Sequence, residues 1–150
     1  MMTRVEEDTD VFVHASDIQL LTDKPVSQIL DWAPTILFVS GPALYRNLTS
    51  GELAAARRRA EALAEKVDVC IIDHHLLRSN DGVRWLDTLM AGTRGRILCG
   101  SDFMKKQRLF LEARRSELYQ RFPVPDRWHE SYASGDETTS AFRRAALTLE

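Results

Sequence analysis

Short apolar runs alternate along this chain with longer segments in which apolar residues recur every three or four positions. The short runs are rich in β-branched residues and predict four strands, at 10–15, 35–40, 67–73 and 96–100. The longer segments predict helices, at 23–33, 49–66, 81–91, 101–122 and 136–150. Strands that alternate with helices favour an α/β fold, a mixed sheet with flanking helices.

Several residues mark the ends of these helices. Thr49 and Glu52 have the spacing of a capping box, Pro25 is placed for a first helical turn, and Gly92 for a helix end. We expect a single domain over residues 1–150, with a flexible or edge segment at 1–9 and a helix within 134–150.

The central run is VDVCIID at 67–73, and HHLLR follows it directly. A strand without polar alternation is expected to be buried on both faces of a parallel or mixed sheet, so Asp73, His74 and His75 should emerge at its carboxyl end. Open α/β sheets bind their ligands at that end, and imidazole is the commonest metal ligand in proteins. The alternative is structural: a histidine pair that caps the next turn, packs against Trp85 or bonds to the backbone. Both interpretations stay open at this point.

The composition limits which kinds of partner the chain can be expected to bind. Twenty Lys and Arg residues stand against 22 Asp and Glu, so there is no overall positive charge for nucleic acid or membrane, although 105–115 is locally basic. No apolar stretch reaches the roughly 20 residues of a membrane span, and the first ten residues are acidic. Cys70 and Cys99 lack metal-binding spacing and are expected to be buried, reduced thiols. We therefore expect a cytoplasmic protein that does not bind membranes.

Five segments resemble, in order, the metallo-β-lactamase-fold hydrolase-like proteins of a largely archaeal, uncharacterised family. They are SDIQ at 16–19, VSGPALY at 39–45, IIDHHLLR at 71–78, LFLEARRSELY at 109–119 and PVPDRWHESY at 123–132. The resemblance implies that the chain is the carboxyl-terminal half of a four-layered αββα sandwich.

The same resemblance implies a metal site. Asp17 corresponds to the carboxylate that bridges two metal ions, His74 to the last metal-binding histidine, and His75 to a residue that supports or replaces it. Further residues are expected to stand behind these ligands or at the rim of the site: His14, Asp73, Arg78 and His129. The expected cofactor is zinc, as one ion or two.

The main signature of that family, an HxHxDH loop, is absent from this sequence. Asp17, His74 and His75 offer three donors at most, which suits an open mononuclear zinc site but not a complete two-metal centre. We therefore expect a homodimer, or a complex with a separately encoded amino-terminal half that carries HxHxDH. No catalytic residue can be assigned from this sequence.

Three functions follow from these observations. The first is a metal-dependent hydrolase that is inactive until a partner completes it. The second is a non-catalytic interaction or structural subunit in which the histidine pair is structural. The third and weakest is RNA or DNA binding, or a nuclease-related role, through the basic residues of 105–115; it rests mainly on fold-level analogy.

Overall fold

The computed structural model describes residues 1–150 except 95, 141–142 and 145–150. It divides the chain into two compact units, Met1–Ala113 and Arg114–Glu150, and each is described here by itself. The expected single domain over 1–150 therefore stays a prediction. Among the described residues, no helix has both the length and the apolar composition to cross a bilayer.

The first unit is built on a mixed five-stranded sheet with the order β1-β2-β3-β4-β5. Its strands are β1 (Thr3–Glu7), β2 (Asp10–Ala15), β3 (Ile36–Ser40), β4 (Val69–Asp73) and β5 (Ile97–Leu98). β1 pairs antiparallel with β2, and the other pairs are parallel. The predicted α/β class and mixed sheet are confirmed. The count of four strands was wrong, because the polar residues at 3–7 form an edge strand.

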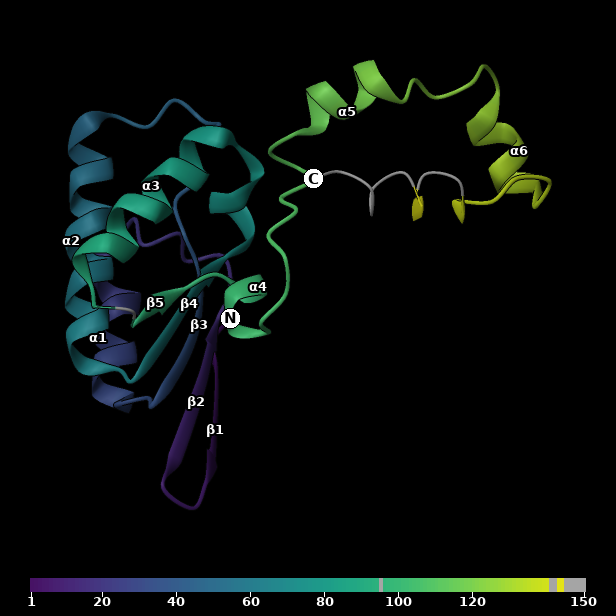
Figure 1. Ribbon diagram of the computed structural model, residues 1–150. Helices are drawn as coiled ribbons and strands as arrows, with labels where there is room; N and C mark the ends of the chain where they lie inside the picture. The colour runs from purple at the N-terminus through teal and green to yellow at the C-terminus, as the bar shows by residue number, and fades with distance from the viewer. Residues whose placement is uncertain (95, 141–142, 145–150) are drawn as a thin grey trace. The chain divides into compact units, whose positions relative to one another are not determined.

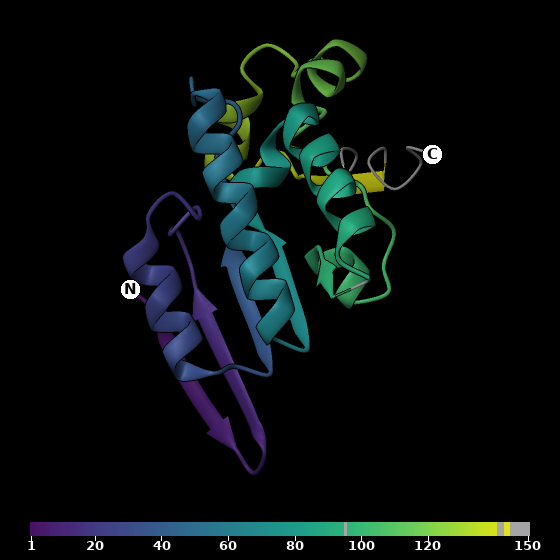
Figure 2. The same ribbon diagram turned by 90° about the vertical axis from the view of Figure 1, so that its left-hand side faces the viewer.

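Three helices cover one face of this sheet, as Figures 1 and 2 show. They are α1 (Asp23–Trp32), α2 (Ser50–Lys66) and α3 (Asn80–Gly92). Each connects one parallel strand to the next, and the strands follow one another in a single direction across the sheet. Because such connections are almost always right-handed, successive crossovers in one direction place their helices on the same side. The chain order itself thus leaves the other face without these helices.

The two faces differ in burial. One row of paired residues, Val13, Leu37, Cys70 and Ile97, crosses the sheet under the helices and is fully buried. Burial raises the pKa of the Cys70 thiol to about 12. Cys70 and Cys99 are both buried and unbridged, as expected for reduced thiols.

A second row of paired residues lies on the opposite face: Val5, Phe12, Ile36 and Val69. Val5 is 53% exposed and Phe12 39% exposed, although both are apolar. Alternate residues of a strand point to opposite faces, so this row marks the face that the helices leave open. It forms an apolar, partly exposed surface, which we call the open sheet face.

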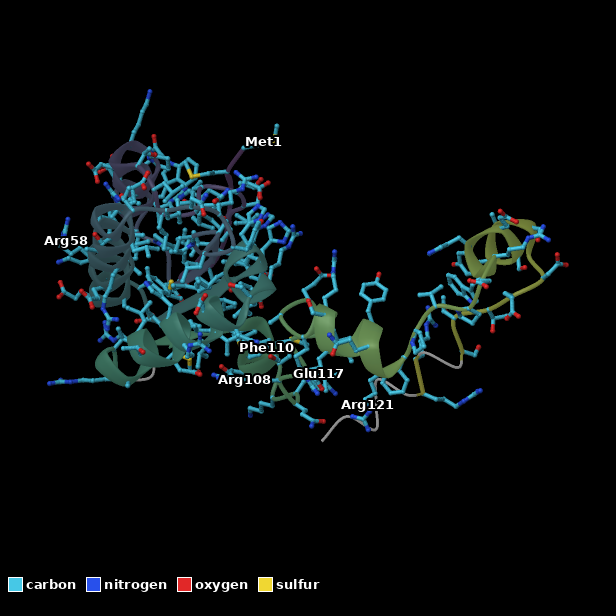
Figure 3. All side chains as sticks on the ribbon, turned by 90° about the horizontal axis from the view of Figure 1, so that it is seen from above. Met1, Arg58, Arg108, Phe110, Glu117 and Arg121 are labelled. Carbon is cyan, nitrogen blue, oxygen red and sulfur yellow. The ribbon has the colours of Figure 1, made fainter. Side chains whose placement is uncertain are left out.

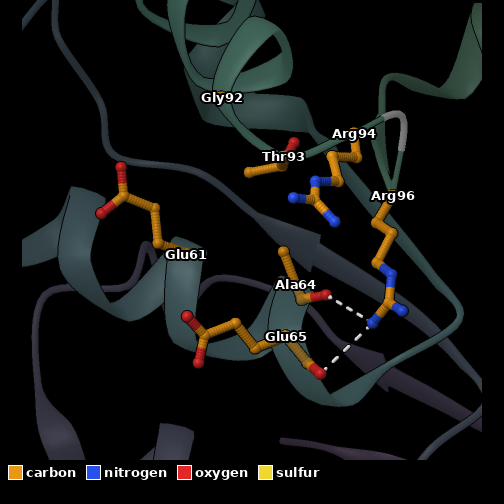
Figure 4. A pocket seen from close by; sticks show the side chains of 7 residues that line it. All are labelled: Glu61, Ala64, Glu65, Gly92, Thr93, Arg94 and Arg96. Carbon is orange, nitrogen blue, oxygen red and sulfur yellow. Dashed lines mark hydrogen bonds between the residues drawn. The ribbon is translucent and has the colours of Figure 1, made fainter.

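Local contacts fix where the helices begin and end. Thr49 and Glu52 form the predicted capping box at the start of α2. At the end of α2, Arg96 Nη1 donates to the carbonyl oxygens of Ala64 and Glu65, at 3.2 Å each, beside an open cavity (Figure 4). A cation at a helix carboxyl terminus satisfies carbonyl groups that have no partner within the helix.

The single long helix predicted at 101–122 is wrong. The structure has the short helices α4 (Gly100–Phe103) and α5 (Arg115–Arg121), with turns and irregular backbone between them. Arg108 explains the difference: its guanidinium bonds to Asp102 and, at 2.7 Å, to Asp87 on α3, and its Cζ lies 5.8 Å from the centre of the Phe110 ring (Figure 3). These tertiary contacts outweigh the helical propensity of the segment.

The second unit contains α5 and α6 (Trp128–Ser134). The Trp128 ring stacks on Tyr132 with their centroids 5.0 Å apart, and its edge meets His129 at 5.3 Å. The helix expected at 136–150 falls largely on 141–142 and 145–150, which lie outside the described residues.

The pairing of Asp102 with Arg108 predicts a pH-dependent contribution to stability. Hydrogen bonding to Arg108 lowers the pKa of Asp102 from 3.8 to about 2. A carboxyl group with a lowered folded-state pKa stabilises the fold above its unfolded pKa, and this contribution is lost as the pH falls through the folded value. We expect Asp102→Asn to lower the free energy of unfolding by about 1–2 kcal/mol at neutral pH and by much less below pH ~3, as measured by urea titration.

Asp81→Asn is the matched control, because within the described residues the ion pair of Asp81 is with the highly exposed Arg84, and such a pair should contribute little. Equal losses from the two variants at neutral pH would contradict this account of the Asp102–Arg108 pair.

Candidate metal centre

The residues of the candidate site follow the carboxyl ends of β2 and β4. Asp17 comes two residues after β2, and His74 and His75 begin the 3-10 turn η1 (His74–Arg78) directly after β4. β3 lies between these strands and pairs in parallel with both. Parallel strands end at the same edge of a sheet, so residues 58 apart in sequence meet at one corner.

One carboxylate and two imidazoles converge there. His75 Nε2 lies 3.0 Å and His74 Nε2 lies 3.5 Å from Asp17 Oδ1, and the two imidazole centroids are 4.4 Å apart. One ligand atom from each residue lies within 4.8 Å of the others. The expected juxtaposition of Asp17 and His74 is present, and His75 is part of it. Metal binding by these residues stays a prediction.

The loop that carries Asp17 is held in an unusual conformation. Asp17, Gln19 and Leu20 all have positive φ, between 50° and 58°. This region costs a non-glycine residue about 1–2 kcal/mol, so the surrounding structure must hold the loop in place. Gln19 N donates to the buried Ser40 Oγ at 3.1 Å, and the Leu20 side chain is fully buried. Asp17 is therefore positioned by contacts on both the sheet and the core.

Asp73 positions the histidine pair through the backbone. Its Oδ1 accepts a bond from His74 N, and its Oδ2 accepts one from Gly100 N at the start of α4, each at 2.7 Å. A Cβ at position 100 would lie 2.6 Å from Asp73 Oδ2, so a larger residue there would displace the Asp73 carboxylate. Asp73 is thus the cap of η1, a role that one interpretation of the sequence gave to the histidines. No bond joins its carboxylate to either imidazole among the described residues.

Tyr45 orients His75 and was not identified from the sequence. Its hydroxyl lies 2.8 Å from His75 Nδ1, on the opposite side of the ring from Asp17. A phenol hydroxyl can donate a hydrogen bond to this nitrogen or accept one from its N–H, so Tyr45 supports either tautomer of the ring. When Nδ1 carries the proton, Nε2 has its lone pair free for a metal. Tyr45 lies in VSGPALY, one of the segments that carry the family resemblance, but nothing in that segment points to His75, 30 residues further along the chain.

The environment of His75 favours its neutral form. Burial lowers the pKa of His75, the charge of His74 lowers it further, and the hydrogen bond that the His75 ring donates to Asp17 opposes both. The His75 side chain is 15% exposed, against 45% for His74. Neutral imidazole is the form that binds metals, and two imidazoles with one carboxylate form a donor set that zinc accepts. The residues present therefore fit a zinc ion with a coordination position left open.

The remaining predicted residues lie around this group. The His14 ring meets Phe38 edge-on at 5.4 Å and lines a cavity of about 280 Å³ together with His74. Arg78, at the end of η1, lines a second cavity of about 490 Å³, again with His74. His129 belongs to the second unit, so its expected place at the rim stays a prediction.

Comparisons identify relatives but no activity. The chain is 47% identical over 137 residues to a UPF0282 protein of Methanosarcina mazei, an alignment that covers 91% of this chain and 45% of that protein. UPF0282 proteins of Korarchaeum cryptofilum and Thermococcus gammatolerans are 26% and 30% identical, over 81% of this chain and 43% and 40% of their own lengths. No family model and no solved structure matches the chain.

The chain thus spans less than half the length of the curated relatives it matches. Its homologues carry the name of an uncharacterised archaeal family, which confirms that part of the resemblance. Nothing in these matches indicates a metallo-β-lactamase fold, and that relationship remains a hypothesis.

The contact with Tyr45 predicts a role in holding His75. Tyr45→Phe removes the partner of Nδ1 and frees the ring to turn, so we expect the affinity for zinc to fall about tenfold or more, measured by titration calorimetry. Tyr119→Phe is the control, since this exposed tyrosine lies on α5 in the second unit. Equal affinities in Tyr45→Phe and the parent protein would show that Tyr45 does not support the site.

Proposed function

We propose that this chain is one half of a metal-dependent hydrolase of the metallo-β-lactamase type, and that Asp17, His74 and His75 bind zinc. The observation that carries the proposal is the convergence of three potential ligands within 4.8 Å at the carboxyl edge of a parallel sheet segment. In an open α/β sheet, this edge is where functional residues gather.

The chain's own residues prepare this corner for a cation. Asp17 supplies a negative charge, and burial favours the neutral form of the His75 ring. The Tyr45 hydroxyl forms a hydrogen bond with Nδ1 of His75, and the Asp73 carboxylate accepts a hydrogen bond from the backbone N–H of His74. When bound, zinc supplies Lewis acidity, which activates water for attack on an ester, amide or phosphodiester. With Asp17, His74 and His75 as its protein ligands, a zinc ion would keep a coordination position for that water.

We further propose that hydrolysis requires a complement to this chain. A two-metal centre needs more ligands than Asp17, His74 and His75 provide, and the sequence contains no HxHxDH loop. The complement is a separately encoded amino-terminal half that carries HxHxDH, or a second copy of this chain. The open sheet face supports a larger assembly, because exposed apolar patches commonly mark interfaces.

A second candidate is a non-catalytic interaction subunit. The open sheet face favours it, since Val5 and Phe12 are suited to packing against a partner whether or not a metal is bound. The nucleic-acid hypothesis is weaker in comparison. Arg108 bonds to Asp87 and Asp102, and Arg114 bonds to Glu117, so much of the positive charge of 105–115 is already paired.

Zinc stoichiometry tests the first proposal. We expect about one zinc per chain after loading and desalting, by elemental analysis, and a loss of at least about half of it in Asp17→Asn and in His75→Ala. Asp68→Asn is the matched control for Asp17→Asn, because this exposed aspartate directly precedes β4, at the opposite end of the strand from His74. Less than about a tenth of a zinc per chain in the parent protein, together with a melting curve unaffected by chelators, would favour the interaction subunit.

The assembly proposal predicts association through the open sheet face. We expect light scattering to give the mass of a dimer, or of a complex when an HxHxDH-bearing half is co-expressed. Phe12→Asp should abolish that association, because it places a charge in the apolar row. Tyr132→Asp, which alters an exposed aromatic side chain of the second unit, serves as the control. A monomer at the highest soluble concentration, with and without such a half, contradicts the proposal.

A further inference from the structure

We propose that the cavity beside His74 binds phosphate esters that carry an apolar group, and that Arg78 is the residue that selects their anionic group. This inference rests on the proposed function, because the cavity is a substrate site only if His74 is a metal ligand. The binding of the anion itself can be measured without metal.

The cavity has the size and position of a substrate cleft. Its volume is about 490 Å³, within the range of small-molecule sites, and it lies entirely in the first unit. The end of β4 and η1 form one side, with His74, Leu77 and Arg78. Residues 107 and 109–112, in the segment that departs from the predicted long helix, form the other. A group held there would lie against a candidate metal ligand.

Arg78 is the cation of this cavity. In a 3-10 turn, side chains three positions apart lie on the same side, which places Arg78 over His75. Arg78 and His74 both line the cavity. Arg78 is exposed, and within the described part of the chain no hydrogen bond or ion pair engages its guanidinium. Arg84, Arg108 and Arg114, in contrast, each bond to a carboxylate. A guanidinium without a protein partner can bind phosphate through two parallel hydrogen bonds.

The acidic residues of the cavity do not cancel this charge directly. Both carboxylate oxygens of Asp73 accept backbone bonds, from His74 and Gly100, and among the described residues no ion pair joins Asp73 to Arg78, although these bonds do not neutralise a carboxylate. Glu112, on the opposite side, also interacts with a partner of its own. Arg78 is thus the guanidinium that the cavity offers to an anion, and Ser101 and Gln107 add neutral polar groups to its lining.

The rest of the cavity is mainly apolar. Leu77, Leu109, Phe110 and Leu111 line it, and Leu111 is 38% exposed. Phe110 is partly buried and packs against the hydrophobic core, which fixes this side of the cavity. A cation beside an apolar surface matches a ligand with the same division, an anionic ester joined to an aromatic or aliphatic group. Inorganic phosphate alone would leave the apolar surface uncovered.

The test is a titration of the metal-free protein with 1-naphthyl phosphate, followed by NMR, with inorganic phosphate, 1-naphthoate and 1-naphthol as comparison probes. We expect 1-naphthyl phosphate to bind most tightly. Arg78→Met should weaken it about tenfold or more, since hydrogen bonds to a charged group are lost, and Arg78→Lys should retain part of the affinity. Leu111→Ser should weaken 1-naphthyl phosphate but leave inorganic phosphate unchanged. Arg84→Met, on the surface of α3, is the control and should bind as the parent does.

The outcomes separate this inference from the metal proposal. The anion-site inference is overturned if Arg78→Met and the parent bind 1-naphthyl phosphate with equal affinity. It is also overturned if 1-naphthol binds as tightly as 1-naphthyl phosphate, or if the parent does not bind 1-naphthyl phosphate. Tighter binding of 1-naphthoate than of 1-naphthyl phosphate assigns the cavity to carboxylates and also overturns the proposal. Zinc uptake, measured after zinc loading of separate samples of the same proteins, should be the same in Arg78→Met as in the parent. If the protein binds 1-naphthyl phosphate through Arg78 but takes up no zinc, the proposed metal-dependent function is contradicted and the anion site is supported.

Discussion

The parallel pairing of β2, β3 and β4 is the constraint on which the rest of this structure depends. It brings three carboxyl ends to one edge, and so it places Asp17 beside His74 and His75 although β3, β4 and two helices separate them in sequence. The same strand order sends every crossover over one face. A single topological fact therefore produces both the candidate metal centre and the open sheet face.

At the carboxyl edge of the sheet, some residues adopt backbone conformations of high energy, and specific contacts stabilise them. Asp17 and His74 both have positive φ, which is unusual away from glycine. Ser40 holds the loop of Asp17, and Asp73 holds the turn of His74. Strained residues persist where the surrounding structure over-determines them, and they cluster at functional sites. The loops at this edge thus carry strain in the very residues that offer metal ligands.

Much of the sheet could be predicted because its strands are locally encoded. The run at 10–15 and the run ending at Asp73 are apolar enough to stand out, and the capping box of Thr49 and Glu52 is contiguous in sequence. β1 could not be predicted in this way, since its polar residues form a strand only by pairing with β2. The helix predicted at 101–122 failed for a related reason: Arg108 bonds to Asp87, 21 residues away, and no local pattern reports that contact. Tyr45 was missed at His75 because 30 residues separate them.

The central claim is that Asp17, His74 and His75 together hold a metal ion. Anomalous diffraction at the zinc absorption edge, from crystals of the zinc-loaded chain, tests it most directly. The account predicts one peak at about 2.0–2.2 Å from the Asp17 carboxylate and from both imidazole nitrogens. A peak elsewhere in the chain, or none while those three side chains stay ordered, would contradict it.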